Sequence, residues 1–193
     1  AVSEAASGDA LLLADEPAGA DSIPDSAESA QLAAMLQAYI DEAESEIIVV
    51  TAYLIPTPEL GVAIRRAASR GVRIRMLTNS LRSNNHTAAH SSYRGFIDDL
   101  LAEGIELHEV RAEAKDRALY MATPVADKHL ALHAKLLLVD DRLTFIGSAN
   151  LDPRSLRLNS EIGIMVDSKE LNSRVREIVA VDLEIRDRRH GQI

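Results

Sequence analysis

The sequence of 193 residues contains no cysteine and no tryptophan, and aromatic residues make up only 3% of it. The absence of cysteine excludes a disulfide scaffold, a thiol nucleophile and any metal site built on thiolates. Long apolar runs are also absent, because residues 47–56, the longest mainly apolar run, fall well short of the roughly 20 residues of a membrane-spanning helix. With 47% hydrophobic and 26% charged residues, the composition is that of an ordinary globular domain.

Basic residues are missing from the first 50 residues, which contain 11 of the 30 Asp and Glu residues and no Lys or Arg. Residues 51–193 therefore carry 21 basic against 19 acidic residues, a net charge of +2, although the whole chain has a formal net charge of -9. A region with nearly equal numbers of acidic and basic residues can contain a local anion site. It lacks the broad basic surface that drives non-specific binding to duplex nucleic acid. We expect an acidic, weakly determined segment over residues 1–25 and one domain over residues 26–193.

The pattern of apolar residues predicts an α/β fold. The β-branched run at residues 47–50 indicates a buried strand, and Thr57, Pro58 and Gly71 mark the beginning and the end of the helix that follows. Together with a strand over residues 72–77, this makes a strand–helix–strand unit whose strands should run parallel. The other expected elements are helices over residues 26–43, 92–103 and 168–186, strands over residues 11–13, 105–110, 132–139, 143–146 and 161–166, and a loop or irregular insertion over residues 111–131.

Two polar side chains interrupt the apolar strand expected over residues 132–139. His133 and Lys135 are two residues apart, and side chains at this spacing on a strand point to the same face of the sheet. We therefore expect an imidazole and an ammonium group to share one site.

Further polar residues follow at fixed offsets. Gly147 and Ser148 come after the next expected strand, where a Gly-Ser turn would offer backbone N–H groups and a hydroxyl to an anion, and Asn150 adds an amide donor. Six residues therefore occur at defined spacings: His133, Lys135, Asp140, Gly147, Ser148 and Asn150. A chance match at a given position is rarer than about one in ten million.

This spacing is similar to the HKD motif of the phospholipase D superfamily. The flanking residues 145–156 and 158–163 resemble the second of the two motif copies in bacterial cardiolipin synthases and related phosphatidyltransferases. The short runs at residues 78–81, 90–93 and 104–107 resemble the same branch. The resemblance covers most of residues 47–167.

The resemblance implies a phospholipase D-type α/β/α sandwich with a mixed, largely parallel central sheet. It also implies phosphatidyl transfer or phosphodiester cleavage on phospholipids through a phosphohistidine intermediate, with cardiolipin synthesis as the leading reaction. A neutral imidazole can attack phosphorus while a second histidine protonates the leaving alcohol. His133 is then either the nucleophile or the general acid, and one half of a paired site does not distinguish them. Lys135, Ser148 and Asn150 would hold the phosphate without a metal or cofactor.

The resemblance also assigns roles to the remaining candidate residues. Glu161 would hydrogen-bond a catalytic imidazole and fix its tautomer. His90 and Tyr93 would lie near the lipid phosphate or at the rim of the pocket, with a solvated helix start as an equal alternative. Asp140 and Gly147 are interpreted as structural residues of the motif.

The family's active site pairs two such motifs, and this chain contains one. We expect the chain to be the C-terminal half of a longer protein, and the alternative is a symmetric dimer that pairs two copies. The expected partners are a phospholipid substrate, a second HKD motif and the membrane surface, in the bacterial cytoplasm or at the cytoplasmic face of its membrane. Two other functions stay open: a nuclease or other phosphodiesterase of the same superfamily, and a non-catalytic half that needs a partner motif.

Overall fold

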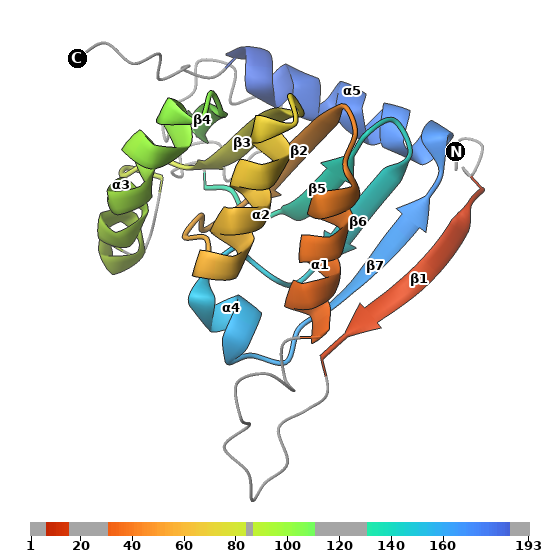
Figure 1. Ribbon diagram of the computed structural model, residues 1–193, viewed down its shortest axis with the longest axis horizontal. Helices are drawn as coiled ribbons and strands as arrows, with labels where there is room; N and C mark the ends of the chain where they lie inside the picture. The colour runs from red at the N-terminus through yellow and green to blue at the C-terminus, as the bar shows by residue number, and fades with distance from the viewer. Residues whose placement is uncertain (1–6, 16–30, 84–86, 111–130, 186–193) are drawn as a thin grey trace, which may run out of the picture.

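The computed structural model describes residues 7–15, 31–83, 87–110 and 131–185. Within these ranges the chain forms a mixed sheet in the strand order β1-β7-β6-β5-β2-β3-β4, with helices on both faces (Figure 1). The strands are β1 (Asp9–Ala14), β2 (Glu46–Thr51), β3 (Arg73–Asn79), β4 (Glu106–Val110), β5 (Lys135–Val139), β6 (Leu143–Gly147) and β7 (Ile162–Asp167). The helices are α1 (Gln31–Glu42), α2 (Pro58–Ser69), α3 (Thr87–Ala102), α4 (Pro153–Arg157) and α5 (Lys169–Ile185). No helix of the described ranges combines the length and the apolar composition needed to cross a membrane.

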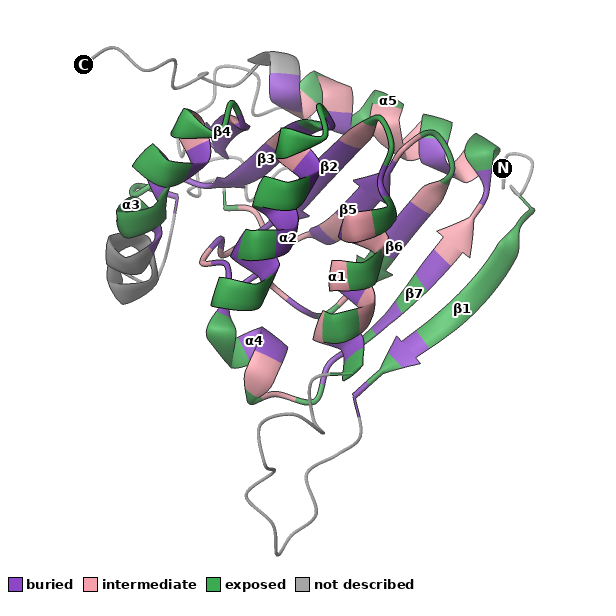
Figure 2. Ribbon diagram, in the orientation of Figure 1, coloured by how far each residue is buried: buried purple, intermediate pink, exposed green. Residues whose placement is uncertain are grey.

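The two faces of the sheet carry separate apolar clusters. In β2, Ile47 and Val49 belong to the cluster that includes residues of α1, α2 and α3, whereas Ile48 and Val50 pack with residues of α5. A strand buried on both faces reads as a continuous apolar run, which explains the β-branched residues at this position. Figure 2 shows the central strands buried and the edge strand β1 mostly exposed. The expected α/β/α sandwich is confirmed.

The directions of the strands differ from the expectation of a largely parallel sheet. Only the neighbours β2–β3 and β3–β4 are parallel, whereas β1–β7, β7–β6, β6–β5 and β5–β2 are antiparallel. For β5–β6 the physical reason is the connection, because the segment 140–142 is a tight turn and a parallel pair needs a crossover of a dozen or more residues. The pairs β5–β2 and β1–β7 join segments far apart in the sequence, so their direction depends on the tertiary fold.

Two of the predicted elements are confirmed closely. The Leu60 backbone N–H donates to Thr57 Oγ1 at 3.4 Å, Pro58 is the first residue of α2, and Gly71 has a φ of 85° beyond its end. The edge strand expected at residues 11–13 is β1, so part of the acidic N-terminal segment lies in the sheet.

Other boundaries differ from the prediction. Helix α3 begins at Thr87 rather than at residue 92, and α4 was not predicted at all, although Asp152 caps it by accepting from the Ser155 backbone N–H at 2.8 Å. Strand β5 begins at Lys135, so His133 lies before the strand. The helix start expected at residue 26 and the insertion expected over residues 111–131 fall outside the described residues, apart from residue 131.

Candidate active site

One end of the sheet collects the polar residues of the motif. The parallel strands β2 and β3 end there, at Thr51 and Asn79. Because β5 runs antiparallel to β2 and β7 runs antiparallel to β6, both begin at this end, just after His133 and Glu161. Strand β6 ends there too, immediately before Ser148. Five segments of the chain therefore meet at one edge, the place where open α/β sheets bind their ligands.

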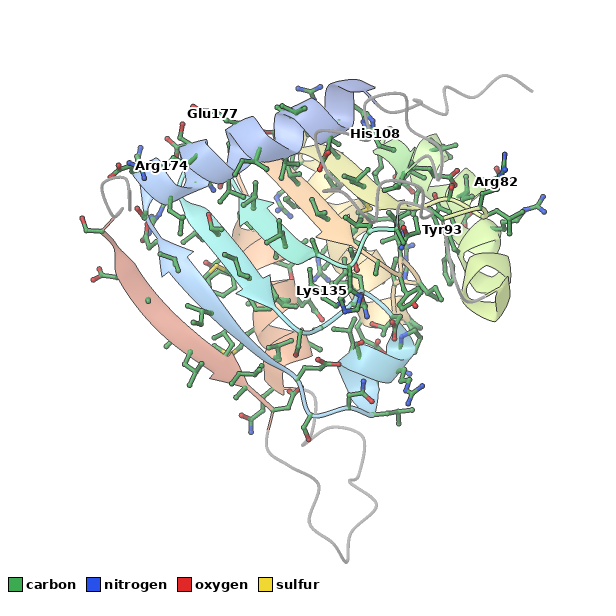
Figure 3. The ribbon with its side chains drawn as sticks, turned by 180° about the vertical axis from the view of Figure 1, so that it is seen from behind. Arg82, Tyr93, His108, Lys135, Arg174 and Glu177 are labelled. Atoms are coloured by element: carbon green, nitrogen blue, oxygen red, sulfur yellow. The ribbon has the colours of Figure 1, made fainter. Side chains whose placement is uncertain are left out.

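The structure brings His133 and Lys135 together. The Lys135 Nζ atom lies 3.3 Å from each ring nitrogen of His133 and donates to the His133 carbonyl oxygen at 2.9 Å. His133 is exposed, whereas Lys135 is only 9% exposed, at the end of the sheet on the side of α4 (Figure 3). The predicted contact is present, but it arises because the lysine side chain turns back over the preceding residues and not because both residues lie on one strand.

The Lys135 ammonium lies in a partly desolvated position. Burial lowers its pKa, and the negative charges of Glu161 and Asp152 act in the opposite direction without cancelling this effect. Because Nζ lies equally far from the two ring nitrogens, the arrangement places a cation directly beside the imidazole. No three His, Asp or Glu side chains of the described ranges gather as a metal site requires.

A hydroxyl and a carboxylate form the second part of the site. Ser148 Oγ donates to Glu161 Oε2, and Asn159 Nδ2 donates to Glu161 Oε1 at 3.0 Å. Among the described contacts, none joins the Glu161 carboxylate to the ring of His133. Within this chain, Glu161 thus holds the Ser148 hydroxyl and acts on Lys135 through its charge.

The Gly-Ser turn differs from the expected anion cradle. The Ser148 backbone N–H donates to the Ile162 carbonyl oxygen at 2.9 Å, so it continues the β6–β7 ladder and is not available to an anion. The Ser148 hydroxyl and the Asn150 side chain remain as donors. Asn150 Oδ1 is buried and makes no hydrogen bond within the described part of the chain.

The two residues expected near the rim lie on α3. Tyr93 is 3% exposed and belongs to the apolar cluster beneath the helix. The structure therefore places its ring in the core. His90 lies in the first turns of the helix, and its side chain lies outside the described part of the structure.

Asp15 is a site residue that the sequence analysis missed. Its carboxylate accepts from the Glu161 backbone N–H at 3.2 Å and from the Leu32 backbone N–H at the start of α1 at 2.9 Å, and its own N–H donates to the Glu161 carbonyl oxygen at 2.9 Å. These bonds fix the backbone of Glu161 from the far end of the sequence. An aspartate in an acidic segment is normally interpreted as a solvent-exposed residue, so no local sequence pattern distinguishes Asp15 from its acidic neighbours.

Gly147 has a steric role. A Cβ atom at this position would lie 2.5 Å from Phe145 Cζ and 2.8 Å from the Ile162 carbonyl oxygen. Gly163 stands opposite in the β6–β7 register, and a Cβ atom there would lie 2.2 Å from Phe145 Cε2. The two glycines leave space for the Phe145 ring against the strands, which lets β6 and β7 deliver Ser148 and Glu161 side by side.

Asp140 lies at the opposite end of β5 from Lys135. Its carboxylate accepts hydrogen bonds from the backbone N–H groups of residues 44–46 and from Ser45 Oγ, at 2.7–3.3 Å. Burial alone would raise the pKa of Asp140, but the bonds from Ser45 and from the backbone outweigh it, and the pKa lies below its usual value. This geometry makes Asp140 a support of the turn between α1 and β2, at a distance from the reacting groups.

Replacing Asp140 by alanine is expected to lower the free energy of unfolding by about 3 kcal/mol, because charged hydrogen bonds are lost and alanine is strained at a φ of 51°. Asp140→Asn keeps one accepting oxygen and tolerates this φ, so its cost should be about 1 kcal/mol. Because the carboxylate's pKa is lowered in the folded state, its contribution is present above the pKa of the unfolded chain and disappears as the pH falls through the folded value. Urea denaturation at neutral and acidic pH measures both effects. Equal costs for the two variants would contradict this role.

The fold and the lysine–histidine pair with its hydroxyl and carboxylate define a phospholipase D-like domain. A comparison with protein families agrees: the family described as "Cardiolipin synthase, PLD-like domain" matches residues 36–182. The chain therefore belongs to this family, within the phospholipase D superfamily.

Individual relatives and solved structures are similar to parts or all of the chain. Cardiolipin synthase C of Escherichia coli (strain K12) is 36% identical over 127 residues, which cover 65% of this chain and 27% of that protein. The chain thus spans about a quarter of the length of this relative. NucT from Helicobacter pylori has a TM-score of 0.67 at 18% identity, covering 93% of this chain and 98% of that chain. Phosphatidylserine synthase of Haemophilus influenzae Rd KW20 has a TM-score of 0.65 at 15% identity, and the match covers 93% of this chain and 39% of that chain. At such identities the solved structures show the fold alone.

Proposed function

We propose that this domain supplies one half of an active site that transfers a phosphatidyl group between alcohols through a phosphohistidine intermediate, with cardiolipin synthesis as the reaction. The observation that carries the proposal is the contact of 3.3 Å between Lys135 Nζ and the His133 ring at the end of the sheet. Membership of a family described by cardiolipin synthase supports the lipid substrate.

The proposed reaction has two displacements at phosphorus. An imidazole nitrogen attacks the phosphodiester and forms a P–N bond, while the bond from phosphorus to the leaving alcohol breaks and a second imidazolium gives that alcohol its proton. The acceptor alcohol then gives its proton to the second imidazole and attacks phosphorus, which releases the first histidine. His133 takes one of these two roles in each motif copy.

The other polar residues would stabilise the negative charge that develops on the non-bridging oxygens. Lys135 supplies the cation, and its partly buried position strengthens the attraction because less water screens it. Ser148 and Asn150 supply neutral donors, and Ser148 reaches the phosphate once its hydroxyl turns away from Glu161. The Asn150 amide requires no rearrangement of a described hydrogen bond.

A second motif is required, and an apolar surface beside the site fits a second phospholipase D-like domain. Leu12, Ile146 and Ile164 stand directly opposite one another across β1, β7 and β6, and they are 62%, 47% and 45% exposed. Ile162, 54% exposed, extends this apolar surface to the site, because its backbone N–H donates to Ser148 Oγ at 3.0 Å. A domain packed there would be adjacent to the catalytic edge. The chain's negative charge and the absence of basic residues in this surface favour a protein partner over an anionic membrane.

Ile164→Glu is expected to convert a self-associating chain into a monomer, because a charge in the middle of the apolar surface must be desolvated on pairing. Val62→Glu is the matched control, since Val62 is 41% exposed on α2, on the other side of the sheet. Sedimentation of both variants and the parent chain measures the effect. A parent chain that self-associates, with Ile164→Glu associating equally strongly, would contradict the proposed surface.

We also propose that the segment after α4 contacts the lipid surface. Leu158 is 79% exposed between α4 and the site, and the exposed Arg154 precedes it by one helical turn. An apolar side chain with a nearby cation suits an anionic lipid surface. Arg157, by contrast, forms an ion pair with Glu59 at 2.7 Å. We propose that this contact is peripheral and, as the family resemblance implies, occurs at the cytoplasmic face of the bacterial membrane.

A second candidate function is phosphodiester cleavage in nucleic acid. The same pair of His133 and Lys135 would act on the phosphodiester linkages of nucleic acid, which contain the same reacting group as a phospholipid. The balanced charge of residues 51–193 opposes it, because backbone phosphates are bound mainly by a basic excess.

The test compares turnover of phosphatidylglycerol vesicles with turnover of DNA, both in the presence of a chelator and over a series of salt concentrations. The proposal predicts transfer or hydrolysis of the lipid and none of the DNA. Turnover of DNA alone would establish the second candidate, and turnover of neither substrate would indicate a half that needs a different partner motif.

A further inference from the structure

Asn79, in one of the runs that resemble the cardiolipin synthase branch, has no role in the site described so far. It is the last residue of β3 and is 4% exposed. Its side chain makes three hydrogen bonds. Asn79 Nδ2 donates to the carbonyl oxygens of Ala52 at 3.1 Å and Leu132 at 3.0 Å, and Asn79 Oδ1 accepts from the Leu132 backbone N–H at 2.8 Å. The amide therefore holds both backbone groups of the residue immediately before His133.

The sheet itself does not hold this part of the chain. The last residue of β2, Thr51, pairs with Lys135, the first residue of β5. Leu132 and His133 lie beyond that pairing, and the next carbonyl of the β2 chain, at Ala52, is bound by Asn79 instead of by a neighbouring strand. The Asn79 side chain replaces the missing strand partner at the point where the chain leaves the sheet and presents the imidazole.

We propose that Asn79 is a positioning residue for His133, a role that rests on the proposed function. By fixing the Leu132 backbone, it sets where the His133 ring stands relative to the Lys135 ammonium. Holding a peptide group in this way needs a donor and an acceptor at the end of one short side chain, and an amide supplies both. An aspartate keeps the acceptor for the Leu132 N–H but loses the two donated bonds.

The neighbouring residue offers a matched control. Thr78 is 2% exposed and donates to the same Ala52 carbonyl oxygen, at 3.4 Å, but makes no described bond to Leu132. Thr78→Val keeps the shape of the side chain and removes that bond. If the hydrogen bond to the Ala52 carbonyl were the source of the lost activity, Thr78→Val would lose activity as well. If the hydrogen bonds to Leu132 are the source, only the Asn79 variants lose activity.

The experiment measures kcat and KM of the 193-residue chain on phosphatidylglycerol vesicles, together with amide hydrogen exchange of Leu132 and the ring NMR signals of His133. We expect Asn79→Ala to lower kcat about 100-fold with KM unchanged, since a displacement of about 1 Å in a reacting group costs this much. Leu132 exchange should accelerate and the His133 signals should shift. Asn79→Asp should show changes at least as large, because its carboxylate would face the carbonyl oxygens of Ala52 and Leu132, and Thr78→Val should behave as the parent chain. Should Asn79→Ala not fold, Asn79→Ser, which is small and polar, decides.

The proposal is overturned if Asn79→Ala keeps the parent kcat, or if it loses kcat while Leu132 exchange and the His133 signals stay unchanged. It is also overturned if Thr78→Val shows the same losses. If the parent chain has no turnover, it is a half that needs a different partner motif, and the NMR measurements alone decide whether Asn79 positions His133.

Discussion

Replacing His133 by asparagine is expected to reduce phosphatidyl transfer by a factor of about 1,000 or more, whichever of its two roles it takes. As nucleophile it forms the P–N bond, and as general acid it supplies the proton to the leaving alcohol, so either loss removes a step that the other groups cannot perform. Asparagine can still donate a hydrogen bond to the phosphate, and binding of the lipid should therefore change little. Initial rates over a range of vesicle concentrations separate kcat from KM.

The control for His133→Asn is its free energy of unfolding, which shows whether lost activity comes from lost structure. His133 is exposed and precedes β5, and exposed substitutions outside strained positions change the free energy of unfolding by no more than about 0.5 kcal/mol. Urea denaturation of His133→Asn should therefore match the parent chain. An inactive variant that is also unstable would contradict a purely chemical role.

Lys135→Met is expected to lower kcat by about 100- to 1,000-fold, because it removes the cation that stabilises the developing charge. Lys135→Arg keeps the charge but changes its shape and reach, so part of the activity should remain. The same Lys135→Met variant should raise the free energy of unfolding by about 1 kcal/mol, since a partly buried ammonium costs solvation energy. Increased stability with lost activity would identify a residue kept for chemistry, and a loss of both would contradict this interpretation.

The electrostatics of Lys135 also predict a pH dependence. The ammonium must be protonated to act, so activity is present below its pKa and disappears as the pH rises through it. Burial lowers the pKa of Lys135, and the charge of Glu161 raises it. Glu161→Gln should therefore move the alkaline decline of kcat to lower pH, and an unchanged decline would exclude Lys135 as its origin.

Local chemistry made much of the fold predictable. Thr57, Pro58 and Gly71 mark the ends of α2 through groups that act within a few residues, and the structure confirms all three. The motif spacing likewise predicted that His133 and Lys135 meet. The short turn at residues 140–142 makes β5 and β6 antiparallel, but the pairings of β5 with β2 and of β1 with β7 join segments far apart in the sequence, so no local pattern gives their direction.

The supporting residues of the site could not be read from the sequence. Asp15 contacts Glu161 across 146 positions and Asn79 contacts Leu132 across 53, and no local pattern announces such contacts. The prediction that His133 lies on a strand was wrong for the same reason, since a side-chain amide from β3 takes the place of the expected strand pairing. The spacing of His133 and Lys135 in the sequence identifies them as candidate reacting residues. The supporting residues Asp15 and Asn79 can be identified only from the tertiary fold.

The most direct test is the intact mass of the chain, quenched during turnover of phosphatidylglycerol with a chelator present. A phosphatidyl adduct on His133 that is labile in acid, and that is absent from His133→Asn, is the predicted result. Turnover that proceeds without an adduct on histidine, or that survives in His133→Asn, would contradict a phosphohistidine half-site in this domain.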